Sequence, residues 1–293
     1  MGAFARSWEI TKLTFSIMKK EKELFLFPIL SIIFSLLFVI AIFFPTIIVV
    51  LLRGDSVILG GLEYLLIFLT YFGIAFIATF FNVCVVYTAA LAFSKKEAKF
   101  WTTIKFALSR IHIILLWSII VASVGLILKI IEGIAERTKG IGRLILSITR
   151  ELLSMAWSVA TIFVIPGMVY HNLGPFAAIK KSVQVLKKTW GEKLILYVGM
   201  NLIAIIFILP AAAIAIFMVY LLIVGSINLL LALSIIAILF AYMISIGIFF
   251  SVAGNIFNTA LYVYGESKVV VPPYRKDLLT SAFKPMKKQG ILG

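Results

Sequence analysis

Few side chains in this chain could perform chemistry, and most of them lie within long apolar runs. A polar group inside a membrane span is costly and commonly has a partner or a ligand, so these residues are the first candidates for a functional site. Seven intramembrane polar candidates stand out: Glu63, Asn82, Lys129, Glu132, Asn201, Asn255 and Asn258.

The spacing of these residues favours structural roles. Lys129 and Glu132 are three residues apart, on one face of a predicted helix. The simplest interpretation is a local ion pair near the outer end of a span, and a substrate or ion gate is the alternative. Glu63 is interpreted as an interfacial acid near the outer surface. The four asparagines predict hydrogen bonds between helices, with ion coordination as the alternative.

Catalytic and metal-binding patterns are absent from the sequence. It contains no H-E-x-x-H, no Walker-type glycine loop, no G-x-S-x-G and no close pair of intramembrane acids. His112 and His171 are the only histidines and Cys84 is the only cysteine, which leaves little for a zinc site and excludes an intrachain disulfide. We therefore predict a protein that is not an enzyme and that has no catalytic residue, metal or cofactor.

The composition excludes a soluble globular domain. The chain has 293 residues, of which 63% are hydrophobic and 13% are charged. Its mean hydropathy is +1.16. Soluble domains are nearer half apolar with about 25% charged residues. A single core of this size could not bury so much apolar surface, because it covers only about three-quarters of the surface of its chain.

The apolar runs predict an all-α, polytopic integral membrane protein with about six transmembrane helices. The predicted spans cover residues 24–52, 57–93, 111–134, 152–170, 194–224 and 229–264. The second and sixth exceed the roughly 20 residues that cross a bilayer, so we expect them to tilt, bend or project beyond it. Residues 135–150 are predicted to be a polar connector with a weak amphipathic pattern of its own at Ile141, Leu144, Ile145 and Ile148.

The connectors between pairs of spans predict amphipathic interfacial helices on the cytoplasmic side. In the clearest one, apolar residues at 176, 179, 183, 186 and 190 form one helix face and lysines form the other. Connectors 3–22 and 94–110 follow the same plan, and Trp8, Trp101 and Trp190 place one tryptophan in each. The candidate lipid-headgroup contacts are Lys95, Lys96, Trp101, Lys180, Lys181, Lys187, Lys188 and Trp190.

The distribution of charge predicts the topology. Of 27 lysines and arginines, 21 lie in the N-terminal segment, the 94–110 and 174–193 connectors and the C-terminal tail, and five lie on the opposite side. The positive-inside rule then places both termini in the cytoplasm of a multi-pass plasma-membrane protein. The net charge of +15 is clustered between apolar runs, so the predicted partners are anionic membrane lipids and not nucleic acid.

The chain is predicted to form a single transmembrane domain over residues 1–265, followed by a cytoplasmic tail over residues 266–293. The domain divides into three units of interfacial helix plus hairpin, near 3–93, 94–173 and 174–265. The sequences F-N-V-C-V-V-Y-T-A at 81–89 and F-N-T-A-L-Y-V-Y-G at 257–265 echo one another. Internal repetition and shared constraints at the end of a span both explain that echo.

Several motifs give the chain a family resemblance. They are R-S-W at 6–8, F-P-I-L at 27–30, A-W-S-V-A-T-I-F-V-I-P at 156–166, L-G-P-F-A-A-I-K-K-S at 173–182, T-W-G-E at 189–192 and the N-T-A-L-Y-V-Y-G-E-S stretch from residue 258. Together they resemble an uncharacterised family of prokaryotic six-span membrane proteins, known as a domain of unknown function. The segment from Pro166 to Trp190 is also similar to the membrane domain of some glycerophosphodiester phosphodiesterases. The resemblance implies a helical membrane fold and transfers no catalytic residue, because the soluble catalytic barrel of those enzymes has no counterpart here.

Two functions are consistent with the sequence. The first is a non-enzymatic membrane protein that organises or senses lipid, alone, as an oligomeric scaffold or with another membrane protein. The alternative is a transporter or channel for a small solute, ion or lipid, because Pro45, Pro166 and Pro210 interrupt spans and broken helices can line binding sites. Scarce glutamine, with Gln184 and Gln289 alone, is typical of a thermophilic source.

Overall fold

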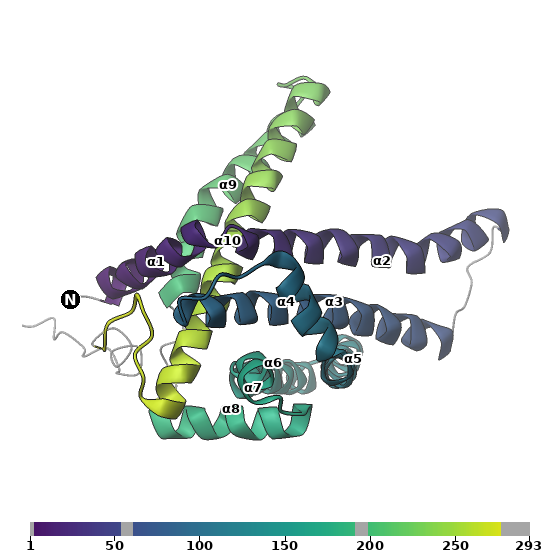
Figure 1. Ribbon diagram of the computed structural model, residues 1–293. Helices are drawn as coiled ribbons and strands as arrows, with labels where there is room; N and C mark the ends of the chain where they lie inside the picture. The colour runs from purple at the N-terminus through teal and green to yellow at the C-terminus, as the bar shows by residue number, and fades with distance from the viewer. Residues whose placement is uncertain (1–2, 54–60, 191–198, 277–293) are drawn as a thin grey trace, which may run out of the picture. The chain divides into compact units, whose positions relative to one another are not determined.

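The computed structural model describes residues 3–53, 61–190 and 199–276. These residues form ten α-helices and no strand, which confirms the predicted all-α class (Figure 1). The helices are α1 (Ala3–Lys20), α2 (Glu23–Arg53), α3 (Gly61–Phe93), α4 (Phe100–Ser109), α5 (Ile111–Arg137), α6 (Ile141–Thr161), α7 (Val164–His171), α8 (Pro175–Trp190), α9 (Gly199–Ile223) and α10 (Leu229–Ser267).

Six segments of the described chain are long and apolar enough to cross a membrane. They lie in α2, α3, α5, α6 with α7, α9 and α10. The prediction of a multi-pass membrane protein with about six spans is therefore confirmed. The two overlong spans are continuous helices, with 33 residues in α3 and 39 in α10.

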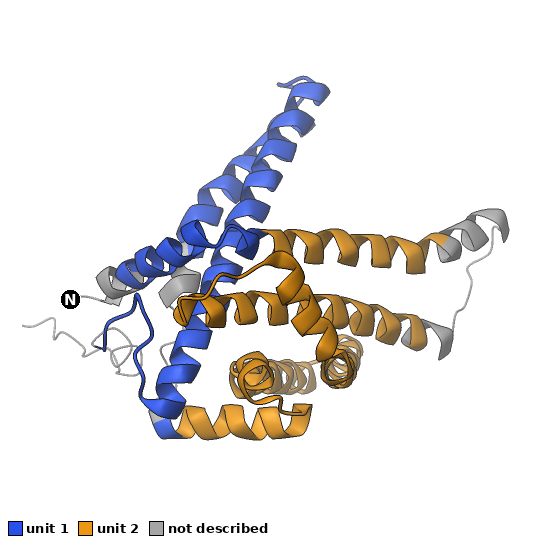
Figure 2. Cartoon of the chain, in the orientation of Figure 1, with its two compact units in different colours: residues 1–25, 188–293 blue, residues 26–187 orange. Residues whose placement is uncertain are grey.

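The chain separates into two compact units, drawn in different colours in Figure 2. Unit 1 combines the two ends of the chain, Met1–Phe25 and Lys188–Gly293, and unit 2 is the continuous segment Leu26–Lys187. In unit 1, α1 packs against both α9 and α10, which pack against each other. In unit 2, α3 packs against α4, α5 and α7, and α5 packs against α6.

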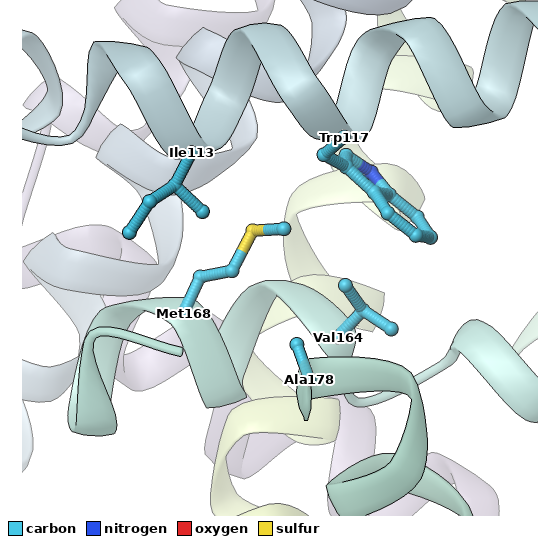
Figure 3. Close-up of a cluster of buried hydrophobic side chains, with 5 residues drawn as sticks. All are labelled: Ile113, Trp117, Val164, Met168 and Ala178. Atoms are coloured by element: carbon cyan, nitrogen blue, oxygen red, sulfur yellow. The ribbon is translucent and has the colours of Figure 1, made fainter. Parts of the chain in front are cut away.

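The core of unit 2 includes a cluster contributed by α5, α7 and α8. Its members are Ile113, Trp117, Val164, Met168 and Ala178, and Figure 3 shows these side chains converging between the three helices. The rings of Trp117 and Trp157 are stacked with their centroids 5.7 Å apart, which extends the cluster onto α6. This cluster fixes the start of α8 against the membrane-spanning helices of its unit.

The fourth span begins earlier than predicted. Helix α6 starts at Ile141, within the stretch predicted to be a polar connector. Apolar side chains at 3-4 spacing line one exposed face of its first half: Ile141, Leu144, Ile145, Ile148 and Leu152. The amphipathic pattern expected in this connector is thus part of a helix. The start of the span was placed too late because charged residues on the other face lower the average hydropathy of this stretch.

Of the three prolines predicted to interrupt spans, Pro166 follows a helix break. Helix α6 ends at Thr161 and α7 begins at Val164. A proline ring clashes with the carbonyl four residues earlier, here that of Ile162, so the break falls there. By contrast, α2 continues through Pro45 and α9 through Pro210.

Candidate functional site

Helix α8 carries three distinct faces. Ala178, Ser182 and Val185 are buried against the rest of the protein. Phe176, by contrast, is 78% exposed. Of the predicted apolar face, Leu186 is buried, Ile179 packs half-buried against the core cluster and Val183 is half-buried. The packed face thus combines small residues with Val185 and Leu186, and it leaves Phe176 for another environment.

The lysines of α8 lie away from its buried face. Lys180, Lys187 and Lys188 are exposed and Lys181 is half-buried. At about 100° per residue, Lys180 and Lys187 turn away from Ala178 and Ser182, whereas Lys181 lies at the edge of the buried face, about 60° from Ala178. Trp190 ends the helix, and its side chain lies outside the described part of the chain.

Helix α4 repeats this arrangement on a shorter scale. Thr103 and Ala107 are fully buried, whereas Trp101 is 70% exposed. Tyr87 of α3 stacks on Phe106 with ring centroids 3.8 Å apart, and Arg110 lies over the other side of this contact, 5.3 Å from the Phe106 ring centre. The contact fixes α4 on the end of α3 and leaves Trp101 pointing away from it.

Lys95 and Lys96 lie in the turn between α3 and α4, and both are exposed. Lys95 has a positive φ of 56°. The Lys96 N–H donates a 2.9 Å hydrogen bond to the Leu91 carbonyl, which closes the end of α3. These two candidate headgroup contacts therefore lie between the end of α3 and the start of α4.

A cluster of charges joins α5 to α6. The Lys129 Nζ lies 3.2 Å from the Glu132 carboxylate, so the predicted ion pair is present. Arg150 of α6 lies 3.9 Å from the same carboxylate and 3.3 Å from that of Glu151. The sequence did not predict that Arg150 joins this ion pair, because the position of Arg150 beside Glu132 depends on how α6 packs against α5.

This cluster borders a cavity of about 340 Å³ between α3, α5 and α6. Aliphatic residues and Tyr71 form most of the wall, and Lys129, Glu132 and Arg150 form its charged part. Such a cavity can hold a molecule with one apolar and one polar end. Its charged groups pair with one another and include no nucleophile with an adjacent base.

The remaining polar candidates are not gathered at this cavity. Asn82 lies on α3, and Asn255 and Asn258 lie on α10; each is half-buried and interacts with a neighbouring group. None of these three lines the cavity. Glu63 and Asn201 lie within α3 and α9, and their side chains fall outside the described part of the chain. Among the residues that the structure covers, no group of three or more His, Cys, Asp or Glu could hold a metal ion.

Comparison with known proteins identifies a family and nothing more specific. No curated protein and no solved structure matches the chain, so the expected likeness to glycerophosphodiester phosphodiesterases has no support there. A family described as "Family of unknown function (DUF6159)" matches residues 61–270, which is more than half of the chain. The chain therefore belongs to this family of unknown function, DUF6159.

Proposed function

We propose that this protein is a non-enzymatic, multi-pass membrane protein that binds and organises anionic lipid through the cytoplasmic helices α1, α4 and α8. One observation carries the proposal: on α4 and α8, strongly exposed aromatic side chains adjoin exposed lysines. Trp101 is 70% exposed and Phe176 is 78% exposed. Burying an apolar side chain of this kind stabilises a protein by roughly 1.5–3 kcal/mol, so we expect another apolar phase to cover both.

The neighbouring lysines favour lipid over a second protein as that covering phase. Charged residues are depleted from the core of protein interfaces, whereas amphipathic helices with lysine on one face and aromatic residues on the other bind the headgroup region. Lys105 lies one turn beyond Trp101, and Lys180 lies one turn beyond Phe176. Each cation near an anionic surface contributes roughly 1 kcal/mol. The charge distribution supports a plasma-membrane location with both termini in the cytoplasm.

Spin-labelled lipids test this proposal on the full-length protein in vesicles. Phosphatidylglycerol and phosphatidylcholine with the same nitroxide-labelled chain are compared for the fraction immobilised at the protein surface. We expect the protein to prefer phosphatidylglycerol. The triple variant Lys180→Gln, Lys187→Gln, Lys188→Gln should lose much of that preference.

The matched control removes three cations from the predicted outer side: Arg137→Gln, Lys139→Gln and Arg143→Gln. It lowers the net charge equally and should leave the inner-leaflet preference unchanged. An equal immobilised fraction of the two lipids on the unaltered protein contradicts the proposal. Cross-linking between two copies of the protein at Leu108→Cys would show that the protein associates with itself. In that case a second copy of the protein, and not lipid, covers Trp101 and Phe176.

The cavity beside Glu132 favours a second candidate function, the transport of a small solute, ion or lipid. Its apolar wall and charged end suit an amphiphile such as a phospholipid. Proteoliposomes with a fluorescent phospholipid in both leaflets test this function, because an impermeant quencher reports movement between leaflets. Activity that disappears in Glu132→Gln, which leaves Lys129 and Arg150 without their shared carboxylate, would support transport. If the quencher removes only the fluorescence of the outer leaflet, as in vesicles without protein, the protein does not transport phospholipid.

A further inference from the structure

The three interfacial helices share one sequence pattern in the same register. An aromatic residue is followed four positions later by a lysine and six positions later by a small residue. The aromatic residues are Trp8, Trp101 and Phe176; the lysines are Lys12, Lys105 and Lys180; the small residues are Thr14, Ala107 and Ser182. The spacing within each helix is identical, although the helices lie far apart in the sequence.

Burial follows the same register in all three helices. The aromatic residues are 40%, 70% and 78% exposed in chain order, and the three lysines are exposed. The small residues are completely buried. The residues two positions after the aromatics, Ile10, Thr103 and Ala178, are also buried. The repeated pattern therefore specifies which side of each helix packs and which side stays open.

The geometry of a helix places the residues of this register on two opposite sides of each helix. Residues four apart are neighbours on a helix surface, so the backbone positions of each aromatic residue and its lysine are adjacent. In α1 the Lys12 Nζ lies 5.8 Å from the centre of the Trp8 ring. Positions two and six residues after the aromatic fall roughly on the opposite side at about 100° per residue. Each helix thus buries one side against the protein and presents an aromatic–lysine pair on the other.

The spans that precede these helices carry a second repeated pattern. The sequence F-x-x-x-x-x-V-Y occurs at 80–87, 163–170 and 257–264. Each occurrence ends a span, in α3, α7 and α10. Among the described residues other than glycine, positive φ occurs at three positions, Lys95, Asn172 and Lys268, and one of them follows each pattern. The sequence pattern therefore recurs three times near the end of a helix, and the residue with positive φ follows it after eight, two and four residues.

Each interfacial helix docks on the end of one such span. Helix α4 stacks Phe106 on Tyr87 of α3. In α8, the Ser182 hydroxyl accepts a 3.2 Å hydrogen bond from the Phe163 N–H, at the start of the second pattern. These two helices follow their spans directly along the chain.

The third span end, that of α10, receives a helix from the other end of the chain. Helix α1 packs against α10, and its small residue Thr14 lies 2.7 Å from the Tyr274 hydroxyl. Tyr274 in turn packs on Phe257, the phenylalanine of the third pattern, with ring centroids 5.9 Å apart. Helix α1 therefore packs on the end of α10 as α4 packs on the end of α3, although α1 does not follow α10 in the chain.

We infer that the chain contains three copies of one headgroup-binding element, in which an exposed aromatic ring and the lysine one turn later bind the phosphate of an anionic phospholipid. The inference rests on the proposed function and names its sites. The lysine supplies a compact, flexible cation for the phosphate, and the aromatic ring occupies the boundary between headgroup and acyl chain. The third copy is completed by α1, which docks after α10 without following it in the chain.

Native mass spectrometry of the full-length protein, extracted from vesicles of phosphatidylglycerol and phosphatidylcholine, counts the retained lipid. We expect up to three phosphatidylglycerol molecules on the unaltered protein, a lower mean number in each of Lys12→Gln, Lys105→Gln and Lys180→Gln, and the lowest number in the triple variant. Each site should weaken by about fivefold, the equivalent of roughly 1 kcal/mol for one surface cation. All altered side chains are exposed, so the variants should fold as the unaltered protein does.

A second triple variant separates this inference from the function on which it rests. Lys19→Gln, Lys20→Gln and Lys99→Gln remove three exposed lysines that lie outside the register and are not among the candidate headgroup contacts. If this variant loses as much lipid as the first, or if only one or two of the single variants lose any, the three-site inference is overturned while the lipid function survives. If no lysine variant changes the retained phosphatidylglycerol, both fail.

Discussion

The hydroxyl groups of Thr14 and Tyr274 lie 2.7 Å apart, although 260 residues separate them in the chain. Both side chains are buried, at 0% and 4% exposure. A second contact reinforces the first, because Arg275 lies 2.9 Å from the Glu9 carboxylate. The two ends of the described chain are therefore joined within unit 1, and the N-terminal helix is a structural part of the C-terminal hairpin.

Removing the Thr14–Tyr274 hydrogen bond should destabilise the protein. Tyr274→Phe removes one buried hydrogen bond, while the Thr14 hydroxyl keeps its 2.8 Å bond to the Ile10 carbonyl. The expected loss is therefore about 0.5–1.5 kcal/mol, the net value of one hydrogen bond. Unfolding in a denaturing detergent, followed by circular dichroism, measures the change in the free energy of unfolding. Ser16→Ala is the matched control, because Ser16 is exposed on the same helix and its hydroxyl bonds only locally, to the Leu13 carbonyl at 2.7 Å. Equal stability of the two variants contradicts the role assigned to Tyr274.

The same tyrosine should make stability depend on pH in the alkaline range. Burial raises the pKa of Tyr274 well above its usual value, and the hydrogen bond with Thr14 offsets only part of that rise. Above pH of about 10 the unfolded chain loses this proton while the folded protein keeps it, so stability falls as pH rises, by about 1.4 kcal/mol per pH unit. Denaturation at pH 9 and pH 11 measures this loss. Tyr274→Phe should show a smaller loss, and an identical loss in both proteins would contradict the prediction.

Helices α2 and α3 should be separated by a side chain at Gly73. A Cβ atom placed there would overlap the ring of Phe38 on α2. We expect Gly73→Ala to destabilise the protein by about 1–3 kcal/mol, a typical cost of overpacking, although alanine favours a helix. Phe38→Ala in the same chain should recover part of that loss. Gly247→Ala is the control, since nothing lies within 4 Å of a Cβ there, and it should be neutral or stabilising. If Gly73→Ala leaves the free energy of unfolding unchanged, α2 and α3 do not pack as closely at Gly73 and Phe38 as described.

The predicted topology can be tested by labelling single cysteines in intact cells. The background variant Cys84→Ser removes the native cysteine, which is buried. A cysteine at Ser56, which lies outside the described residues, should react with an impermeant maleimide from outside the cell. A cysteine at Lys188, exposed on α8, should react only after the cells are opened. The reverse pattern would place the lysine-rich helices on the outer side.

The sequence alone predicts most of the membrane architecture. Long apolar runs have favourable transfer free energies wherever they occur, so the spans could be located without knowing their neighbours. The ion pair of Lys129 and Glu132 was predictable for a related reason, because residues three apart on a helix meet whatever the rest of the chain does. Lys105 of α4 and the α8 lysines were likewise predicted to lie on polar faces; Lys105, Lys180, Lys187 and Lys188 are exposed, and Lys181 is half-buried.

The sequence predicted only part of the side of α8 that packs. Leu186 of the predicted face is buried and Ile179 packs on the core cluster, but the buried side is centred on Ala178 and Ser182, and Phe176 is exposed. Both faces are apolar enough to be buried, and the choice depends on how closely the backbone of α8 approaches α5 and α7. Periodicity measures the amphipathicity of one helix and contains no information about that approach.

The tertiary structure alone decided which distant segments meet. It placed Arg150 beside Glu132, opened a cavity against α3, and brought Thr14 to Tyr274. Membrane insertion depends on free energies that add along the chain, so a sequence is sufficient to predict it. Contacts between helices depend on the shapes of two surfaces at once, and only the folded chain determines which surfaces face each other.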